Sequence, residues 1–470
     1  MLSFVILFFS FHWFENVESF VPEARYAHSA TLVNNKLYFF GGQISELKQG
    51  QELFHIYDEL FYLDVSSSFS IESPSWTDLT ASKNVPVRSS WSTSSVGFGI
   101  KSDKSTIYLI GGLMYVINQN DLVTDIIYAF DTKSQQWKLP VINGAGPNRR
   151  REVQAVSDNT GNIYYFGGIS DYTTTGSPTE NVTRYNTLNI LDTAQLTWSI
   201  GSTNDAPSPR EGYSATLYIN FIIYIGGKEN SYDSRPFRLV NISQIPVYDI
   251  QSSMWYLTTV GGANVSNRYA HSAILAQNNL IVIHGGISKG ELPAPQQLIA
   301  LNITSLPYKW IVPTTSSLSP YAIPPPLSLH SATSVGKYMI IAFGNITNAT
   351  RSASSDIYLL DTTNWTWVTT FQPNPTHVNI VIIGAIVGVV LFILIIIAFI
   401  VLYIRIRKKN AGNFSSTKNT PPSSSRNSIS NPSPNPQEIV SESYNARTTY
   451  VRPRPKSNPL LKPYSTLANT

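Results

Sequence analysis

The chain has 470 residues and not one cysteine. Disulfide bonds, thiolate nucleophiles and thiolate metal ligands are therefore excluded, because each of them needs a cysteine sulfur. Disulfides matter most in domains that are too small to bury an adequate core. The segment that precedes residue 380 is long enough to bury such a core without them.

Charge is missing from one long apolar stretch, Ile380–Ile404, which also contains no amide side chain. A helix over this stretch, rising ~1.5 Å per residue, is long enough to cross a hydrocarbon layer of ~30 Å. The core helix of a soluble protein would carry polar residues on one side. The stretch 380–404 is therefore predicted to be a transmembrane helix.

Basic residues are absent from 370–379, just before this helix, and follow it immediately. They are Arg405, Arg407, Lys408 and Lys409. Positively charged flanks stay in the cytosol, so the C-terminus is predicted to be cytoplasmic and the larger part of the chain to lie outside the cytosol.

The N-terminus carries a shorter apolar run, Leu2–Phe14. Small residues at Val17 and Ser19 predict cleavage before Phe20, which makes 1–19 a signal peptide. An uncleaved anchor is the alternative. The chain is thus predicted to be a single-pass type I protein of the plasma membrane or another membrane of the secretory pathway.

The charge is divided unequally by the predicted helix. Residues 405–470 contain 11 Lys and Arg and 2 Glu, a net +9, so the total of +4 leaves −5 for residues 1–404. Without Glu15 and Glu18 of the signal peptide, the external domain holds −3. An acidic domain of this kind is not expected to bind nucleic acid.

The tail, 405–470, is basic and rich in Ser, Asn and Pro, and it is predicted to be disordered because it has little apolar surface to bury. Its basic residues suit anionic lipids of the cytoplasmic leaflet. Tyr464 and Leu467 fit a tyrosine-based sorting pattern, so a cytoplasmic adaptor is a possible partner.

Between the two apolar segments, one pattern recurs six times: an apolar strand that ends in a glycine pair, a second strand that ends in Asp or Asn, and then a Trp. The glycine pairs are Gly41-Gly42, Gly111-Gly112, Gly167-Gly168, Gly226-Gly227 and Gly285-Gly286. The tryptophans are Trp76, Trp137, Trp198, Trp255, Trp310 and Trp367. In the sixth unit, Gly344-Asn345 is interpreted as the pair, with Asn in place of the second glycine because Asn tolerates the left-handed conformation.

A second motif precedes most of the pairs and begins with arginine in five units. These arginines are Arg25, Arg88, Arg151, Arg210 and Arg268. Since they recur at one place in the unit, hydrogen bonding between units is the preferred interpretation, and an anion-binding ring is the alternative.

With its glycine pairs and spaced tryptophans, the chain resembles the kelch repeats of galactose oxidase and attractin-like proteins. The resemblance implies an all-β propeller over 20–371, with six four-stranded blades around a channel. A linker, 372–379, joins it to the membrane helix. A seventh blade is less expected because few residues are left over, and the sequence does not say how the ring closes.

Seven Asn-x-Ser/Thr sequons lie in the predicted external part and are candidate glycosylation sites. They are Asn181, Asn241, Asn264, Asn302, Asn345, Asn348 and Asn364. Crowding is expected to spare Asn302 and Asn345, which occupy repeat positions. Glycans on the other sequons would leave the surface of blades 1 and 2 less covered. These two blades are therefore the first candidates for contact with a protein partner.

Long loops follow the glycine pairs at 43–59, 169–188 and 228–246. In kelch propellers such loops line one rim of the channel, so the resemblance implies a binding surface for an extracellular protein or glycan. The candidate contact residues are those with large planar or charged groups. They are Tyr172, Tyr232, Arg235 and Arg238.

No catalytic residue, cofactor or metal is predicted. The copper site of galactose oxidases needs a cysteine crosslinked to tyrosine, which this chain cannot form. His28, His271 and His330 share one repeat position, which is typical of a structural role. A binding protein is therefore predicted, with a membrane-tethered carbohydrate oxidase and a scaffold acting through its tail as alternatives.

Overall fold

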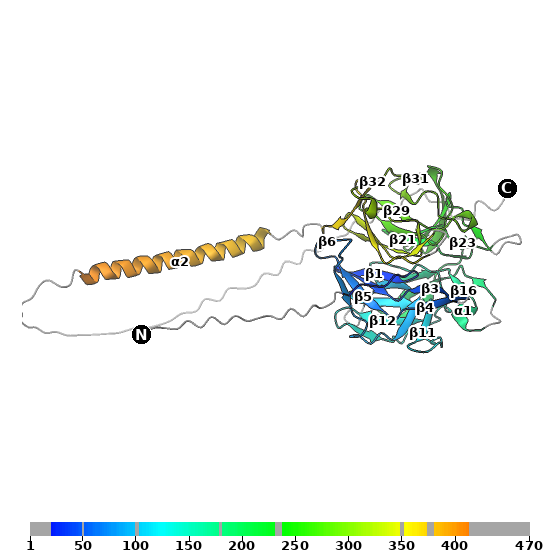
Figure 1. The fold of residues 1–470 in the computed structure, drawn as a ribbon, viewed down its shortest axis with the longest axis horizontal. Coiled ribbons are helices and arrows are strands. Elements are labelled where there is room, and N and C mark those ends of the chain that lie inside the picture. The colour runs from blue at the N-terminus through cyan, green and yellow to red at the C-terminus, as the bar shows by residue number, and fades with distance from the viewer. Residues whose placement is uncertain are drawn as a thin grey trace, which may run out of the picture. The chain divides into compact units, whose positions relative to one another are not determined.

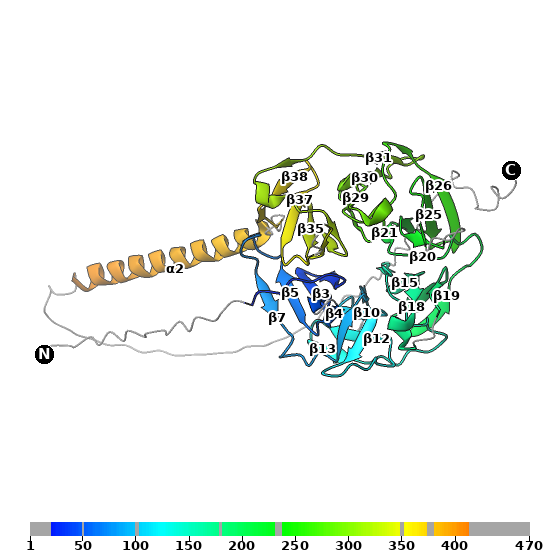
Figure 2. The ribbon, with the colours of Figure 1, turned by 45° about the vertical axis from the view of Figure 1, so that its right-hand side comes forward.

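Among the described residues, the repeats form six sheets that lie in a ring (Figure 1, Figure 2), each with four antiparallel main strands and two of them with a fifth, parallel strand. The computed structural model describes residues 20–48, 51–98, 103–177, 181–230, 237–347, 352–373 and 380–412. The chain divides into two units, one with all the strands and one with helix α2 (Ile380–Gly412). Predictions for 1–19, 374–379, Tyr232, Arg235, Asn348 and the tail from 413, with Tyr464 and Leu467, lie outside the described residues.

Each sheet, called a blade here, takes its four main strands from one contiguous stretch of the chain. Blade 1 has β1 (Ser29–Val33), β2 (Lys36–Phe40), β5 (Leu60–Asp64) and β7 (Trp76–Asp78). Blade 2 has β9 (Thr93–Gly97), β10 (Thr106–Ile110), β12 (Ile127–Asp131) and β13 (Gln136–Lys138). Blade 3 has β14 (Val156–Ser157), β15 (Asn162–Phe166), β18 (Leu188–Asp192) and β19 (Thr197–Ile200).

The other three blades repeat this order. Blade 4 has β21 (Ser214–Tyr218), β22 (Phe221–Ile225), β25 (Gln244–Asp249) and β26 (Met254–Thr259). Blade 5 has β28 (Ser272–Leu275), β29 (Leu280–His284), β30 (Leu298–Asn302) and β31 (Lys309–Ile311), with β27 (Gly261–Gly262) parallel to β31. Blade 6 has β34 (Ser331–Val335), β35 (Tyr338–Ala342), β37 (Ile357–Asp361) and β38 (Thr366–Val368), with β32 (Ser316–Ser317) parallel to β38.

The repeated Asp or Asn closes the turn after the third strand of every blade. In blade 2, for example, Asp131 Oδ1 accepts hydrogen bonds from the backbone N–H groups of Lys133 and Ser134. Such Asx turns use the side chain in place of a backbone acceptor. The same bond is made by Asp64, Asp192, Asp249, Asn302 and Asp361.

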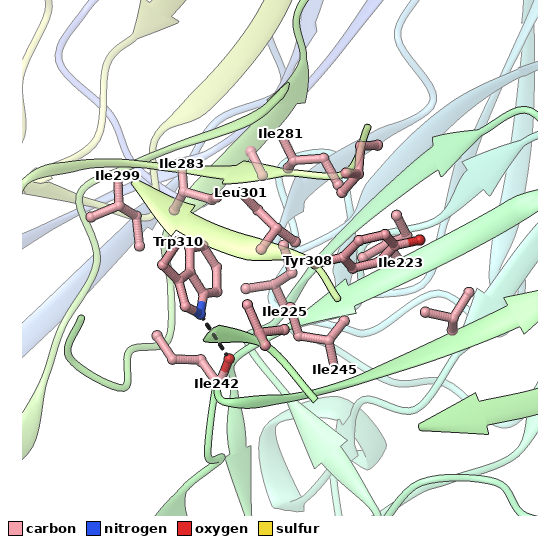
Figure 3. Close-up of a cluster of buried hydrophobic side chains, with 14 residues drawn as sticks. Ile223, Ile225, Ile242, Ile245, Ile281, Ile283, Ile299, Leu301, Tyr308 and Trp310 are labelled. Carbon is pink, nitrogen blue, oxygen red and sulfur yellow. Dashed lines mark hydrogen bonds between the residues drawn. The ribbon is translucent and has the colours of Figure 1, made fainter. Parts of the chain in front are cut away.

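The repeated Trp packs against the preceding blade and fills the space between the two sheets. Trp310 of blade 5 belongs to one buried cluster with Ile223 and Ile225 of blade 4, and its Nε1 donates to the Ile242 carbonyl at 3.1 Å (Figure 3). Trp255 contacts Phe166 of blade 3 in the same way. One blade cannot bury both of its faces alone, so the core consists of a series of such interfaces.

The second residue of each glycine pair joins its blade to the next by a backbone hydrogen bond. The Gly42 N–H, for example, donates to the Ser89 carbonyl at 2.8 Å. The others are Gly112 to Arg150, Gly168 to Arg210, Gly227 to Arg268, Gly286 to Leu327 and Gly344 to Arg25. The last of these bonds runs from blade 6 back to blade 1 and completes the ring.

The ring closes between blade 6 and blade 1 without exchange of a main blade strand, a point that the sequence left open. Two short strands, β6 (Phe69–Ser70) and β39 (Thr370–Phe371), pair antiparallel across this junction. The rings of Phe69 and Phe371 stack with centroids 5.0 Å apart. Phe20, the first residue after the predicted cleavage site, packs on Phe61 of blade 1, so both ends of the propeller lie at one junction.

The interpretation of the sixth glycine pair as Gly344-Asn345 is wrong by one residue. Phe343 has φ 57° and takes the place of the first glycine, while Gly344 has φ 110° and makes the bond of the second. Asn345 lies in a strand, β36 (Asn345–Ile346). A side chain is accommodated at Phe343 because its ring enters the blade 1 core, against Phe39 and Trp76.

Helix α2 begins at Ile380 as predicted but continues to Gly412, beyond the predicted end at Ile404. The residues that follow the apolar stretch, Arg405 to Lys409, are good helix formers, and the helix meets no proline before its end at a glycine. Within it, Gly388–Lys408 is long and apolar enough to cross a membrane, and this is the one such segment among the described residues.

Candidate binding face at the channel mouth

A second layer of short strands lies over the glycine-pair end of the blades. In every blade, the residue after the repeat-arginine position pairs with the residue after the glycine pair. The pairings, called the collar here, are Tyr26–Gln43, β8 (Val87–Ser90) with β11 (Leu113–Val116), Arg151–Ile169, β20 (Arg210–Glu211) with β23 (Lys228–Glu229), Tyr269–Ile287 and β33 (Leu327–Ser328) with β36.

The predicted long loops extend from this collar. The first is a hairpin of β3 (Gln43–Lys48) and β4 (Gln51–Ile56), on which Leu53 and Phe54 are about half exposed. The second holds β16 (Ile169–Ser170), the short helix α1 (Tyr172–Thr175) and β17 (Thr183–Arg184). The third holds β24 (Arg238–Leu239), which pairs with β23. Two turns of 3₁₀ helix, η1 (Lys289–Glu291) and η2 (Pro320–Ala322), complete the set of described elements.

The channel opens inside the collar, and one residue from each blade stands at its mouth. These residues are Ala27, Trp91, Glu152, Gly212, Ala270 and Leu329. All six have positive φ, between 54° and 65°, which turns the chain from the collar into the inner strand. They line a cavity of about 500 Å³ to which all six blades contribute.

Opposite charges from blades 3 and 4 meet beside this mouth. The Lys228 ammonium lies 3.5 Å from Glu211 Oε1 and 3.8 Å from Glu152 Oε2. Its nitrogen is also 4.2 Å from the centre of the Tyr269 ring. Burial raises the pKa of the Glu211 carboxyl, and the neighbouring Glu152 carboxylate raises it further. The cations Arg184 and Lys228 favour the ionised form of Glu211 and oppose that shift.

Arg151 links this cluster to helix α1. Its guanidinium donates to Asp171 Oδ2 at 2.5 Å, contacts Glu152 and lies 5.5 Å from the centre of the Trp91 ring. Asp171 caps α1 by accepting from the Thr173 and Thr174 N–H groups. Burial opposes ionisation of Asp171, but these bonds keep the pKa of its carboxyl below the ordinary value. The mouth of the channel and the adjacent loop are therefore one connected polar network.

The arginine motif was aligned one residue out of register in blades 2 and 3. When the blades are aligned on their mouth residues, which have positive φ, the repeat-arginine position holds Ser89 in blade 2, not Arg88. In blade 3 it holds Arg150, not Arg151. Arg150 donates to the Gly167 carbonyl at 2.9 Å, and Arg25 and Arg268 donate to Gly41 and Gly285 at 3.0 Å. These side-chain bonds lie within a blade, so the expected bonding between blades is made by the backbone instead.

Two of the four predicted contact residues are described, and both lie at the glycine-pair end. Tyr172 on α1 is 63% exposed. Arg238 on β24 is 40% exposed and pairs with Glu229 Oε1 at 3.1 Å. Sequence reasoning missed Trp91, Glu152, Glu211 and Lys228. A correct alignment of the six repeats would have identified these residues, because each lies at a repeat position next to the channel mouth.

The described sequons differ in exposure. Asn181, Asn241, Asn264 and Asn364 are exposed, whereas Asn302 and Asn345 are half-buried. Asn302 caps a turn, and the Asn345 Oδ1 is buried without a hydrogen-bond partner among the described residues. Glycosylation at the exposed sites stays a prediction.

The repeated histidines link neighbouring blades through serine hydroxyls. His28 contacts Ser331 at 2.8 Å, His271 contacts Ser214 at 2.9 Å and His330 contacts Ser272 at 2.6 Å. These contacts are of the structural kind that the recurrence of the three histidines predicted. No group of three His, Asp or Glu side chains comes together as a possible metal site in the part of the chain that the structure describes. That the protein has no catalytic role stays a prediction.

Known proteins share this architecture. The Attractin/LZTR1 β-propeller model matches residues 6–286, and the KLHDC2/KLHL20/DRC7 kelch-repeats domain matches 235–383. The solved structure of YjhT superposes with a TM-score of 0.52 at 13% identity, covering 74% of this chain and 97% of that one, which supports the fold alone.

Curated relatives have a higher sequence identity to this chain than that structure has. Kelch domain-containing protein 3 of Rattus norvegicus is 27% identical over 56% of this chain, which spans 64% of that protein's length. The N-(sulfonatooxy)prop-2-enimidothioate sulfolyase of Thlaspi arvense is 24% identical over 57% of this chain and 71% of its own. The chain is a kelch-repeat β-propeller protein and belongs to the Attractin/LZTR1 β-propeller family.

Proposed function

We propose that this protein is a single-pass type I membrane protein whose propeller binds an extracellular protein through the collar and its loops. The observation that carries the proposal is the placement of exposed apolar residues and a charged network at one end of a rigid ring. Leu53, Phe54 and Tyr172 are exposed there, and large apolar and aromatic side chains supply most of the energy in protein interfaces. Glycans are the alternative class of ligand for this face.

Binding to intact cells tests the collar. The double variant Tyr172→Ala, Arg238→Ala removes one ring and one cation from the loops, and each loss is expected to weaken saturable binding about tenfold. Purified full-length protein in detergent is titrated onto cells, and the bound fraction is measured.

A matched double variant alters the opposite end of the blades. Ile219 is an exposed apolar residue in the turn between β21 and β22, and Lys133 is a cation paired with Asp103 in the turn after β12. Ile219→Ala, Lys133→Ala is expected to bind like the parent protein. Equal losses from both double variants, or no saturable binding by the parent, would contradict recognition by the collar.

The orientation in the membrane has its own test. If the propeller is outside the cytosol, the exposed sequons at Asn181 and Asn264 receive glycans, because the glycosylating enzyme acts in the lumen. An Asn-glycan endoglycosidase should then increase gel mobility, and Asn181→Gln, Asn264→Gln should reduce that change. Asn413, in the sequon Asn413-Phe414-Ser415 on the predicted cytoplasmic side, serves as the control, since Asn413→Gln should change nothing. Unaltered mobility of the parent protein would argue against this orientation.

The alternative of a membrane-tethered enzyme draws support from one relative, which is named a sulfolyase. Oxidase activity, the form of this alternative expected from the resemblance to galactose oxidases, would release peroxide on incubation with galactose. The binding proposal expects no such release. The tail scaffold alternative expects altered location when the chain is truncated after Lys409.

A further inference from the structure

The segment that joins blades 5 and 6, residues 312–326, exposes apolar side chains beside β32, the outermost strand of blade 6. Leu318 is 74% exposed, Tyr321 82% and Ile323 50%. Ala322, between the last two, is buried in the core of blades 5 and 6 and holds the segment in place. Single exposed apolar residues are ordinary, but these three lie within six residues and form one patch, called the rim patch here.

Charge is absent around the rim patch. No Asp, Glu, Lys or Arg occurs from Val312 to Gly336. The segment 260–267, which precedes blade 5 in the same way, instead carries the exposed sequon Asn264. β32 runs parallel to β38, so the patch lies at the end of β38 that points away from the sequon at Asn364. No charged group would therefore have to leave water if the patch entered a less polar environment.

The backbone of the rim patch has no unpaired donor. Residues 320 and 324–326 are prolines and have no N–H group. Every other N–H from 318 to 326 is bonded within the chain: Leu318 to Trp367 at 3.1 Å, Ser319 to Ser317 at 3.3 Å, Tyr321 to Ser319 at 3.3 Å, Ala322 to Ser319 at 3.0 Å and Ile323 to Pro320 at 3.5 Å. An irregular loop normally exposes unpaired N–H groups, which oppose its entry into lipid. This loop lacks that obstacle.

Chain connectivity keeps the rim patch near the predicted membrane. Leu318 bonds to Trp367 on β38, and Phe371 ends the last strand four residues later. Residues 372–379 separate Phe371 from the apolar stretch that starts at Ile380, and they can span at most about 30 Å. Covalent geometry alone therefore holds this edge of blade 6 within reach of the bilayer surface. On the blade 1 side of the same junction, the turn after β6 exposes Glu72 instead.

We propose that the rim patch contacts the outer surface of the lipid bilayer that holds the membrane helix, and so sets which side of the propeller faces the lipid. Tyr321 lies at the level of the head groups, where aromatic side chains with a polar end are enriched, and Leu318 and Ile323 enter the acyl boundary. Zwitterionic lipid suffices, because the patch has no cation to attract anionic head groups. The inference rests on the membrane anchoring in the proposed function, not on protein binding by the collar.

Site-specific labelling tests this contact, since a chain without cysteine accepts a single label at an introduced one. The full chain with Leu318→Cys carries an environment-sensitive fluorophore in phosphatidylcholine nanodiscs that contain a nitroxide-labelled lipid. Val141→Cys is the control, an exposed apolar residue in the segment between blades 2 and 3, three blades away around the ring. The lipid nitroxide is expected to quench the label at 318 roughly threefold more than the label at 141, and aqueous iodide should do the reverse.

Matched double variants show whether the patch itself makes the contact. In the Leu318→Cys chain, Tyr321→Ser with Ile323→Ser is expected to lower quenching by the lipid roughly twofold, because serine has little affinity for the interface. Both side chains are exposed, so the fold should persist. Leu139→Ser with Ile200→Ser removes two exposed apolar side chains from blades 2 and 3 and should leave the quenching unchanged.

The contrary outcomes separate this inference from the proposed function. Equal quenching of the two labels, in discs that hold the chain, would overturn the lipid contact and leave the anchoring intact. A label at 318 that is shielded from iodide but not quenched by lipid would also overturn it, in favour of a protein partner or a second copy of the chain. Failure of the chain to co-elute with the discs would contradict the anchoring itself, and the lipid contact with it.

Discussion

Replacing Gly41 by alanine is expected to destabilise the propeller by roughly 3 kcal/mol, because it combines a strained backbone conformation with a steric clash. Gly41 has φ 57°, and a Cβ on it would lie 2.0 Å from the Ser89 carbonyl oxygen. That oxygen cannot retreat freely, since it accepts the Gly42 N–H bond that joins blades 1 and 2. The measurement is thermal unfolding of the purified chain, with a fall in melting temperature of roughly 5 °C or more.

Gly261→Ala is the matched control. Gly261 is also a propeller glycine, but it is exposed, and a Cβ on it would meet no atom within 4 Å. The melting temperature of the Gly261→Ala variant should stay within about 1 °C of the parent value, as for ordinary surface substitutions. Similar losses from Gly41→Ala and Gly261→Ala would contradict the role assigned to the first glycine of the pair.

The contacts of Phe343 explain why this position is not glycine in all six blades. The Phe343 ring packs edge-on against Phe39 and Phe61 of blade 1, with centroids 5.4 and 5.9 Å away. The Arg25 guanidinium lies 5.5 Å from its centre. At the junction that closes the ring, a buried aromatic side chain thus offsets the cost of positive φ in a bulky residue. Sequence could not reveal this, since it depends on contacts between the first and last blades.

The blades themselves follow from the sequence because their determinants are local and repeated. Glycine pairs, Asx turns and tryptophans each recur at one place per unit, so six weak indications support one another. The ring closure rests instead on β6 and β39, which have two residues each and lie at opposite ends of the domain sequence. Pairing of such short, distant segments leaves no pattern that periodicity could detect.

The candidate site was harder to predict for a related reason. Lys228, Glu211 and Glu152 come from two blades and have no common spacing, and three consecutive arginines, 149–151, allowed the repeat to be misaligned. With Arg150 at the repeat position, Arg151 is identified as a collar residue that faces Asp171. Loop residues such as Tyr172 were predicted from composition and loop length alone. These features indicate on which end of the propeller a residue lies, but not which side chains it contacts.

Acidification from pH 7 to pH 5 is expected to destabilise the propeller by several kcal/mol, because buried neutral histidines gain protons on unfolding. Burial lowers the pKa of His271 and of His330 to about 3 and lowers those of His28 and His284 well below the ordinary value. Below pH ~6.5, the unfolded chain binds protons that the folded chain cannot, so stability falls as pH falls. His271 and His330 alone contribute about 2 kcal/mol each over this range.

The slope of stability against pH identifies the histidines responsible. His271→Gln keeps a polar side chain beside Ser214 and removes one titrating group, so the loss between pH 7 and pH 5 should shrink by about 2 kcal/mol. His55→Gln, on the exposed β3–β4 hairpin, is the matched substitution of a surface histidine. Denaturant unfolding at each pH measures the slope. A slope unaffected by His271→Gln would show that acid acts elsewhere, with the buried acids around Lys228 as the next groups to replace.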